Sequence, residues 1–477
     1  MPVQWIVGGV VAAVTGLVAP APTVTPTVHW AQCTRDDVGS EVECGTITVP
    51  IDWAKPNGDT ISVAVYRLRA ANRSSVKGTI ANFADGPGAT GDIAFASLRM
   101  LSPDYDLIAV DPRGVGGSSP LMCDIKDPKN FKLPPVLPPT TAAGMAGLEA
   151  DQAAFRKACG TKPAAALTHL DADSVARDTD YLRQALHLPK INIYGHSYGT
   201  LIGEKYLARF GQHVRASVLE GVMDPAKDRR RFVTTAAAES EAGFTAFDRW
   251  CAANTSCALH GQDVAAVLRK AQAKAEAGQI PGTFFGREWS ADGVVQAVQL
   301  NMDSHRLPTL ATQLAQLAEG RNPIPDHGGG PGDLPQSVPY TDPIVCQDFA
   351  LAVPGPAEAA GDLAAERRAA PITGYNTNSS QYTALCVGWP GTAPGAGTPA
   401  RSTSSTPALL VSNAIDVATP TDWAHSVAGQ LGDKAALVVV DQLGHGGSIS
   451  VPGCGQDLIR RYLDDLGVPA AGTRCAS

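Results

Sequence analysis

The sequence predicts an α/β fold in which a mostly parallel, doubly wound sheet carries an inserted helical cap. Apolar strand patterns alternate with helical patterns in the first half of the chain, stop near residue 225 and return after residue 400. Continuous apolar strands alternating with helices are typical of a parallel sheet covered on both faces. The 477 residues are enough for such a sheet and an insertion.

Short apolar runs bounded by turn residues predict the strands of the first half. These runs are 46–51, 61–68, 79–83, 105–110, 191–193 and 216–219. Helical spacing of apolar residues covers 171–186, and a second helix is expected over 198–210. A proline-rich excursion, with four prolines between 134 and 139, separates the fourth strand from the first helix.

The pattern between residues 225 and 400 is helix-rich, as over 264–277 and 291–302, with loose Gly/Pro segments at 324–339 and 391–407. Strands then return at 408–412 and 435–440, followed by a helix near 456–466. We therefore expect a signal peptide at 1–25, a first core part at 26–224, a helical cap at 225–400 and a second core part at 401–477.

The N-terminal segment resembles a secretory signal. Residues 5–18 carry no charge and are followed by Ala-Pro-Ala-Pro, although residues 1–4 contain no Lys or Arg. A lipid-facing anchor or a wrongly chosen start site are the alternatives. The apolar run is too short to span a bilayer securely. We expect a secreted or cell-envelope protein with no stable membrane insertion once the signal is removed.

Ten cysteines, an even number, agree with an oxidising compartment. Connectivity cannot be deduced from sequence, and the simplest arrangement pairs neighbours along the chain. The pairs would be 33 with 44, 123 with 159, 251 with 257, 346 with 386, and 454 with 475. No C-x-x-C motif or zinc-like Cys/His spacing occurs, so no metal and no cofactor are predicted. The net charge of −8, with one short basic cluster at 229–231, argues against nucleic acid as a partner.

Residues 193–200 contain a G-x-S-x-G motif, preceded by a β-branched run and followed by a helical pattern. This order predicts that Ser197 lies on a sharp strand-to-helix turn as an exposed nucleophile. Gly195 and Gly199 would let the flanking segments pack closely around it. A turn of purely structural use is the alternative.

A serine nucleophile needs a base and an acid, here expected in the order Ser, acid, His. Asp416 follows the strand at 408–412, and His445 follows the strand at 435–440 between glycines. Both would lie at the carboxyl ends of parallel strands, where the crevice of such sheets opens. The alternatives are a turn-capping aspartate and a structural loop histidine. His196 is expected to point away from Ser197 and to pack under the turn.

Backbone N–H groups must stabilise the oxyanion of acyl transfer. We expect one from Tyr198, after the nucleophile, and one from Gly86 in the Gly-Pro-Gly turn that follows the third strand. A plain β-turn is the alternative for that loop. The glycine-rich segment 114–119 lacks the Gly-Lys-Ser/Thr of a phosphate loop and is expected to be a tight loop that lines the cleft.

Together these segments resemble the secreted tripeptidyl aminopeptidases, which have the α/β-hydrolase fold and are related to proline iminopeptidases. The resemblance depends on the motifs at 86–88, 111–118, 195–200, 219–225, 416–420 and 444–446. This sequence departs from the proline iminopeptidase pattern in two places. Ala84-Asp85 occupies the position of the His-Gly in the iminopeptidase loop, and His196 occupies the position of a Gly. The resemblance implies a serine exopeptidase that releases short peptides, typically tripeptides, from free N-termini.

An exopeptidase of this kind needs a carboxylate for the substrate ammonium, because burying that charge unpaired is costly. The candidates are Glu220, Asp224 and Asp348, each of which could instead be a structural ion pair or cap. The predicted partner is thus a peptide or a small ester. A carboxylesterase or lipase with the same triad is the main alternative, and a non-catalytic binding protein with this fold is a further one.

Overall fold

The computed structural model describes residues 27–34, 39–92, 95–124, 134–159, 164–324, 337–339 and 342–476. The expected signal peptide, residues 1–25, lies outside these ranges and stays a prediction. Among the described residues, none of the helices combines the length and the apolar character needed to cross a membrane.

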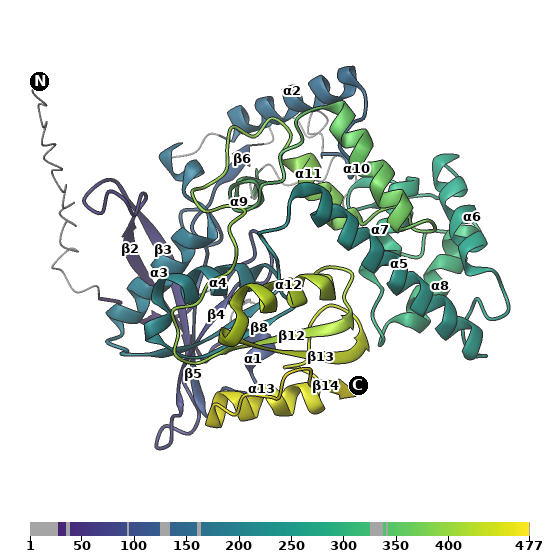
Figure 1. Cartoon of the computed structure of the whole chain (residues 1–477). Coiled ribbons are helices and arrows are strands. Elements are labelled where there is room, and N and C mark those ends of the chain that lie inside the picture. The colour runs from purple at the N-terminus through teal and green to yellow at the C-terminus, as the bar shows by residue number, and fades with distance from the viewer. Residues whose placement is uncertain are drawn as a thin grey trace, which may run out of the picture.

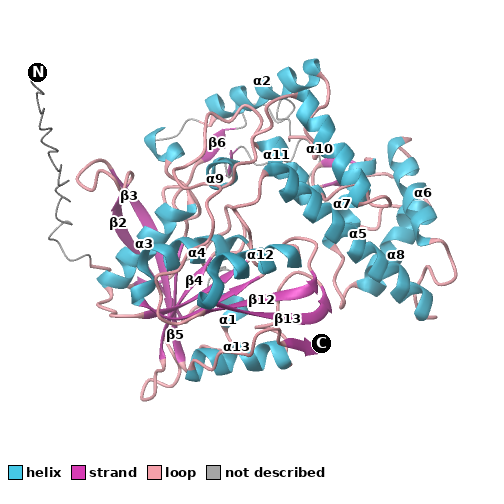
Figure 2. Cartoon of the chain, in the orientation of Figure 1, coloured by secondary structure: helices cyan, strands magenta, loops and turns pink. Residues whose placement is uncertain are grey.

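The centre of the molecule is a mostly parallel sheet, as the sequence predicts (Figures 1 and 2). In the described residues its strand order is β1-β2-β3-β5-β4-β7-β8-β12-β13-β14. The pairs from β1 to β5 in this order are antiparallel, and all later pairs are parallel. The strands are β1 (Ala31–Gln32), β2 (Val42–Pro50), β3 (Thr60–Leu68), β4 (Gly78–Phe83), β5 (Tyr105–Val110), β7 (Ile191–His196), β8 (Val214–Glu220), β12 (Ala408–Ile415), β13 (Ala435–Leu443) and β14 (Arg474–Ala476).

Helices cover both faces of this sheet. On one face lie α3 (Ala172–Ala185), α4 (Tyr198–Phe210) and α12 (Thr421–Leu431), and on the other lie α1 (Phe95–Leu98) and α13 (Cys454–Asp465) (Figure 2). Two separate apolar clusters fill these layers, one with Leu201 and Trp423 and the other with Ile459 and Tyr462. Burial of the strands on both faces explains their continuous apolar runs.

A helix-rich region stands beside the sheet (Figure 1). It contains α5 (Arg229–Ala253), α6 (Val264–Glu276), α7 (Ala291–Leu300), α8 (Leu307–Ala318), α9 (Asp342–Asp348), α10 (Pro356–Ala369) and α11 (Thr377–Leu385), with the short hairpin β9 (Thr283–Phe284) and β10 (Arg287–Glu288). Helices α5 to α8 share an apolar core of their own, which reaches Val417 and Leu443 of the sheet domain.

The observed packing does not follow the expected cap boundaries at residues 225 and 400. The excursion after β5 joins the helical region, because β6 (Met122–Asp124) pairs with β11 (Ser337–Pro339) and the apolar side of α2 (Ala142–Ala158) packs on Val353 and Val387. Conversely, Ile344 and Phe349 of the expected cap lie in the main core of the sheet domain. These contacts depend on apolar side chains whose partners are distant in sequence, so composition alone does not reveal them.

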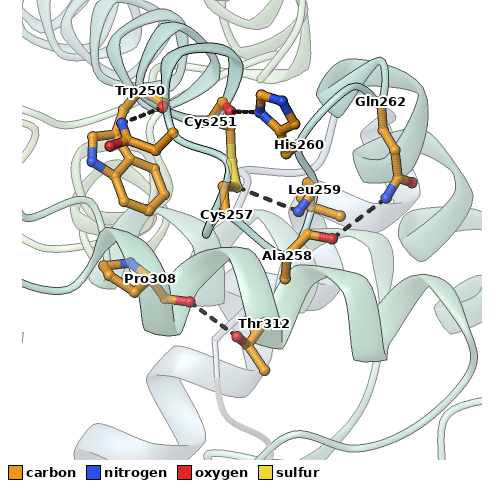
Figure 3. Close-up of a disulfide and its surroundings, with 10 residues drawn as sticks. Trp250, Cys251, Cys257, Ala258, Leu259, His260, Gln262, Pro308 and Thr312 are labelled. Carbon is orange, nitrogen blue, oxygen red and sulfur yellow. Dashed lines mark hydrogen bonds between the residues drawn. A yellow bond between two sulfur atoms is a disulfide. The ribbon is translucent and has the colours of Figure 1, made fainter.

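All ten cysteines lie in the described ranges and form the five neighbour pairs that the sequence analysis favoured. The smallest loop, Cys251–Cys257, closes the end of α5 (Figure 3). There the Cys251 carbonyl bonds with Nδ1 of His260 at 2.9 Å, and Leu259 N–H donates to Cys257 Sγ. Each disulfide reduces the conformational entropy of the unfolded chain and thereby stabilises the fold.

The Asp-Pro-Arg-Gly segment after β5 fixes the loops beside the strand ends. The Asp111 carboxylate accepts hydrogen bonds from the N–H groups of Gly91 and Gly117. The Arg113 guanidinium is fully buried and forms two hydrogen bonds to Asp178 on α3, at 2.8 and 2.6 Å. The glycine-rich segment 114–119 thus packs around the buried Asp111 carboxylate. This contact gives the segment a structural role.

The buried Arg113–Asp178 pair generates a stability prediction. We expect Arg113→Ala to lower the free energy of unfolding by about 3–5 kcal/mol, because it leaves the Asp178 carboxylate buried without its charge partner. Urea denaturation measures the effect. The control is Arg209→Ala, which removes a partly exposed pair with Asp173 and should cost about 1 kcal/mol or less. Equal losses in the two variants would contradict the assigned role.

Candidate active site

The G-x-S-x-G segment forms the strand-to-helix turn that the sequence predicts. Strand β7 ends at His196, α4 begins at Tyr198, and Ser197 between them has φ 54° and ψ −125°. Such a conformation is strained for a residue with a side chain and persists only where the surroundings enforce it. Ser197 N–H donates to the carbonyl of Glu220 at the end of β8, at 2.9 Å. The sheet therefore holds the backbone of the turn.

The glycines of the motif are required by close packing. A Cβ on Gly195 would lie 2.5 Å from the carbonyl oxygen of Gly199, and a Cβ on Gly199 would lie 2.7 Å from that of Phe83. Both distances are shorter than van der Waals contact, so any side chain would push the first turn of α4 away from β7 or β4. The absence of side chains lets these three elements meet behind Ser197.

The acid and the base that the sequence predicts lie in contact. Asp416 follows β12, His445 follows β13, and Nδ1 of His445 lies 2.9 Å and 3.0 Å from the two carboxylate oxygens of Asp416. The Asp416 side chain is fully buried, whereas the His445 side chain is 28% exposed. With Nδ1 facing Asp416, the Nε2 atom of the imidazole is left for a reacting group.

Burial by itself raises the pKa of the Asp416 carboxyl, but the neighbouring His445 and the N–H and O–H of Thr419 outweigh it, so this pKa lies below its ordinary value. The carboxylate accepts from the N–H of Ala418 and from both groups of Thr419. Asp416 is therefore held in its ionised form, as the orienting acid of a triad must be.

Two further side chains support the acid, and the sequence analysis missed both. Glu239 on α5 accepts the backbone N–H of Asp416 at 2.9 Å, and burial raises the pKa of its carboxyl. Thr419 donates its hydroxyl to Asp416. The Asp-x-x-Thr-Pro spacing could have suggested Thr419 as a turn partner. Nothing in the sequence indicates Glu239, because its contact depends on how α5 packs against the sheet.

The base lies beside the nucleophile turn. The rings of His196 and His445 pack with their centroids 4.7 Å apart, and a Cβ on Gly221, just after β8, would lie 3.1 Å from Cε1 of His445. The loops after β7, β8, β12 and β13 thus converge at one edge of the sheet. This is the edge at which parallel sheets hold their ligands.

The expected placement of His196 is wrong. Its ring lies against the base instead of packing under the turn, and its Nδ1 is 3.5 Å from the Asp85 carboxylate. Burial lowers the pKa of His196, but Asp85 outweighs that effect and the pKa is raised. Side-chain direction at the end of a strand depends on the loop that packs over it, which the sequence does not reveal.

The expected oxyanion donors are not both available. Tyr198 N–H already donates to the carbonyl oxygen of Asp85, at 2.8 Å. That carbonyl belongs to the same peptide unit as the N–H of Gly86, the second expected donor. The loop after β4 is therefore beside the nucleophile, as predicted, but in this structure it places an acceptor against Tyr198.

Two of the expected ammonium anchors are buried and bonded within the protein. The Glu220 carboxylate accepts from the Tyr194 hydroxyl at 2.6 Å and from Ser448 N–H at 2.5 Å. The Asp224 carboxylate accepts from Ala226 N–H and from the Gln430 amide, both at 3.0 Å. Both side chains are at most 1% exposed, so neither meets a substrate in this structure. Asp224 lies just after β8, as predicted, whereas Glu220 is the last residue of that strand. The sequence did not predict the direction of either side chain.

The third expected anchor, Asp348 on α9, lies behind the nucleophile turn. Its carboxyl group contacts the hydroxyl of Tyr198 and accepts Ala172 N–H at the start of α3. Burial, with a smaller contribution from Asp171, raises the pKa of Asp348 to about 7. The residue is only 3% exposed, so it fixes the Tyr198 side chain instead of facing the cleft.

Comparison with known proteins shows which families the chain resembles. Residues 86–317 match a family model described as alpha/beta hydrolase fold, and residues 370–475 match one described as TAP-like protein. A tripeptidyl aminopeptidase of Streptomyces lividans is 32% identical over 280 residues, 54% of this chain and 51% of that protein. The chain has the α/β-hydrolase fold and is similar to TAP-like proteins.

Two further relatives of this chain come from Mycobacterium tuberculosis. One is named carboxylesterase B and is 29% identical over 484 residues, which cover 96% of this chain and 91% of that protein. The other is named serine protease Hip1 and is 30% identical over 259 residues, 52% of this chain and 49% of that protein. The matches to the tripeptidyl aminopeptidases span about half of those proteins' length.

The buried Asp348 generates a prediction about stability and pH. In the unfolded protein this carboxyl loses its proton near its ordinary pKa of 3.8, whereas the folded protein keeps it until about pH 7. The folded state therefore binds more protons in this window, and its stability falls as pH rises from about 4 to about 7. Asp348→Asn has no such titration. We expect its unfolding free energy, relative to wild type, to increase steadily across that window in urea titrations.

The control for this pH dependence is Asp433→Asn, which changes an exposed carboxylate in the short turn that follows α12. Its difference from wild type should stay flat over the same pH range. Parallel curves for wild type and Asp348→Asn would show that the carboxyl is ionised in the folded protein at acidic pH.

Proposed function

We propose that this TAP-like hydrolase is a serine exopeptidase that releases short peptides, tripeptides in particular, from free N-termini. The observation that supports this most is the contact between the buried Asp416 carboxylate and His445, next to a serine in strained backbone. The names of the relatives, tripeptidyl aminopeptidase and serine protease, point to the same chemistry.

In the proposed reaction, the Ser197 hydroxyl adds to the carbonyl carbon of the substrate, and its proton passes to Nε2 of His445. The C–N bond then breaks, and the leaving amine takes this proton. Water attacks the resulting acyl-enzyme, gives a proton to His445, and the serine hydroxyl is restored. Asp416 stabilises the imidazolium in both steps, because its carboxylate stays ionised at Nδ1.

We also propose that the protein works outside the cytoplasm, in the medium or the cell envelope. Five disulfides support this location, since such bonds persist in oxidising compartments. The uncharged N-terminal run is consistent with export.

A carboxylesterase is the second candidate, and one structural observation favours it. All three carboxylates that were expected to bind a substrate ammonium are buried and already hydrogen-bonded. An ester needs no such anchor. The relative named carboxylesterase B also matches nearly the whole chain. The two activities share the triad and differ in what the pocket binds, so a substrate comparison separates them.

The triad generates the first functional prediction. We expect Ser197→Ala and His445→Ala to reduce kcat by a factor on the order of 10⁴ or more, and Asp416→Asn by about 10³ to 10⁴, because the three groups act as one unit. Initial rates on a p-nitrophenyl ester measure this. His425→Ala and Asp433→Asn alter exposed residues and serve as matched controls with wild-type rates expected. Full turnover by Ser197→Ala would refute the proposed nucleophile.

The second functional prediction concerns substrate preference and is tested with a panel of substrates. Rates are compared for p-nitroanilides of di- and tripeptides, each with a free or an acetylated N-terminus, and for p-nitrophenyl esters. A tripeptidyl exopeptidase should cleave the free-amine tripeptides best and lose kcat/KM by at least about tenfold on acetylation, since the ammonium must be paired in the site. Turnover of esters alone would decide for the carboxylesterase.

A further inference from the structure

The N–H of Tyr198 is the first backbone donor after the nucleophile and lies at the start of α4. If the proposed acyl transfer at Ser197 is right, on which this inference rests, the oxyanion must form where this N–H points. In the structure that position is taken by the Asp85 carbonyl oxygen, at 2.8 Å from the Tyr198 nitrogen. The Asp85 oxygen occupies the place of the oxyanion, and two negatively polarised oxygens at that place would repel each other, so the site is closed to an oxyanion.

The peptide unit between Asp85 and Gly86 contains both the C=O that blocks the oxyanion site and the N–H that could serve as its second donor. In a planar trans peptide the C=O of one residue and the N–H of the next point in opposite directions. While the Asp85 carbonyl faces Tyr198, the Gly86 N–H must therefore face away from it. Turning this plane by about half a turn exchanges the two, and both Tyr198 and Gly86 would then offer an N–H to the same point.

The local sequence permits this rotation. It changes ψ of Asp85 and reverses the sign of φ at Gly86, which lies outside the left-handed region in the present conformation. A glycine adopts both signs of φ at little cost. The space around it is open as well, since a Cβ on Gly86 would meet only the Ala89 side chain, at 3.9 Å.

Tyr198, whose N–H bonds to this peptide, is held in place by its surroundings. Tyr198 is 3% exposed, and its hydroxyl is held by Asp348. The first turn of α4 is also packed against β4 through Gly199. By contrast, the Asp85 side chain is 40% exposed, and its ionic contact with His196 spans 3.5 Å. Of the two groups joined by this hydrogen bond, the loop peptide is the weakly held one.

We propose that the Asp85–Gly86 peptide is a two-position element that closes the oxyanion site at rest and opens it by rotating when a substrate carbonyl binds. The contact between Asp85 and His196, whose ring packs on His445, favours the closed position and links it to the base. The enzyme would thus complete its catalytic site only when a substrate is present.

The test uses phenylboronic acid as a mimic of the tetrahedral intermediate. The Ser197 oxygen adds to the trigonal boron, its proton passes to His445, and no group leaves. We expect a crystal structure of the wild-type adduct to show one boronate oxygen within hydrogen-bond distance of both Tyr198 N and Gly86 N, with the Asp85 carbonyl turned away. An adduct in which the Asp85 carbonyl still accepts from Tyr198 would overturn the proposal.

A variant tests the rotation in solution. Gly86→Ala fits the closed position, where φ is ordinary and space is available, but it disfavours the positive φ of the open one. We expect an unchanged Tm, with kcat/KM and the affinity for phenylboronic acid both reduced at least about tenfold. Gly429→Ala, in open space on α12, is the matched control and should leave all three values unchanged.

Wild-type kcat/KM and boronate affinity in Gly86→Ala would overturn the two-position element while leaving the proposed function intact. A wild-type protein that neither binds the boronate nor cleaves any ester or peptide would overturn the proposed function itself. If Gly86→Ala does not fold, the closed position does not tolerate a side chain, and the wild-type adduct structure decides between the two loop positions.

Discussion

The close packing of β7, α4 and the loop after β4 around Ser197 is the constraint on which the rest of this structure depends. A serine with positive φ is unfavourable in isolation, and it persists here because three backbone segments meet without side chains between them. The turn then places Ser197 just beyond the end of β7. The same packing brings the loop after β4 to Tyr198, so the conformation of that loop decides what the helix N-terminus can bind.

Glu220 connects the parts of the site that come from different ends of the chain. Its backbone carbonyl accepts Ser197 N–H, and its carboxylate accepts Ser448 N–H in the segment that follows His445. The nucleophile turn and the histidine loop are thus tied to one residue of β8. The sequence resemblance made Glu220 a candidate for substrate binding, whereas its contacts give it a structural role. A buried carboxylate that is already bonded stabilises the site without meeting the substrate.

The two buried aspartates near the site differ in charge because their surroundings differ. Asp416 receives several N–H and O–H donors and a histidine, and these keep its pKa low despite full burial. Asp348 has fewer donors, a second carboxylate nearby and a phenol, and its pKa rises to about 7. The first can therefore orient a cationic imidazole, and the second can remain neutral behind the turn. The helical region also takes part, since Glu239 on α5 fixes the backbone of Asp416.

The sequence by itself determined the alternation of the main strands and helices and the contact between Asp416 and His445, and the simplest cysteine pairing agrees with the structure. These follow from local patterns: the strand 105–110 and the helix 198–210 have the predicted bounds, and residues that end neighbouring parallel strands must meet at one edge. The tertiary structure alone decided the direction of His196, the burial of Glu220, Asp224 and Asp348, the support from Glu239 and the closed loop at Asp85. Each of these depends on which distant side chain or carbonyl packs over a position. Periodicity and spacing describe the backbone path, but they do not specify those neighbours.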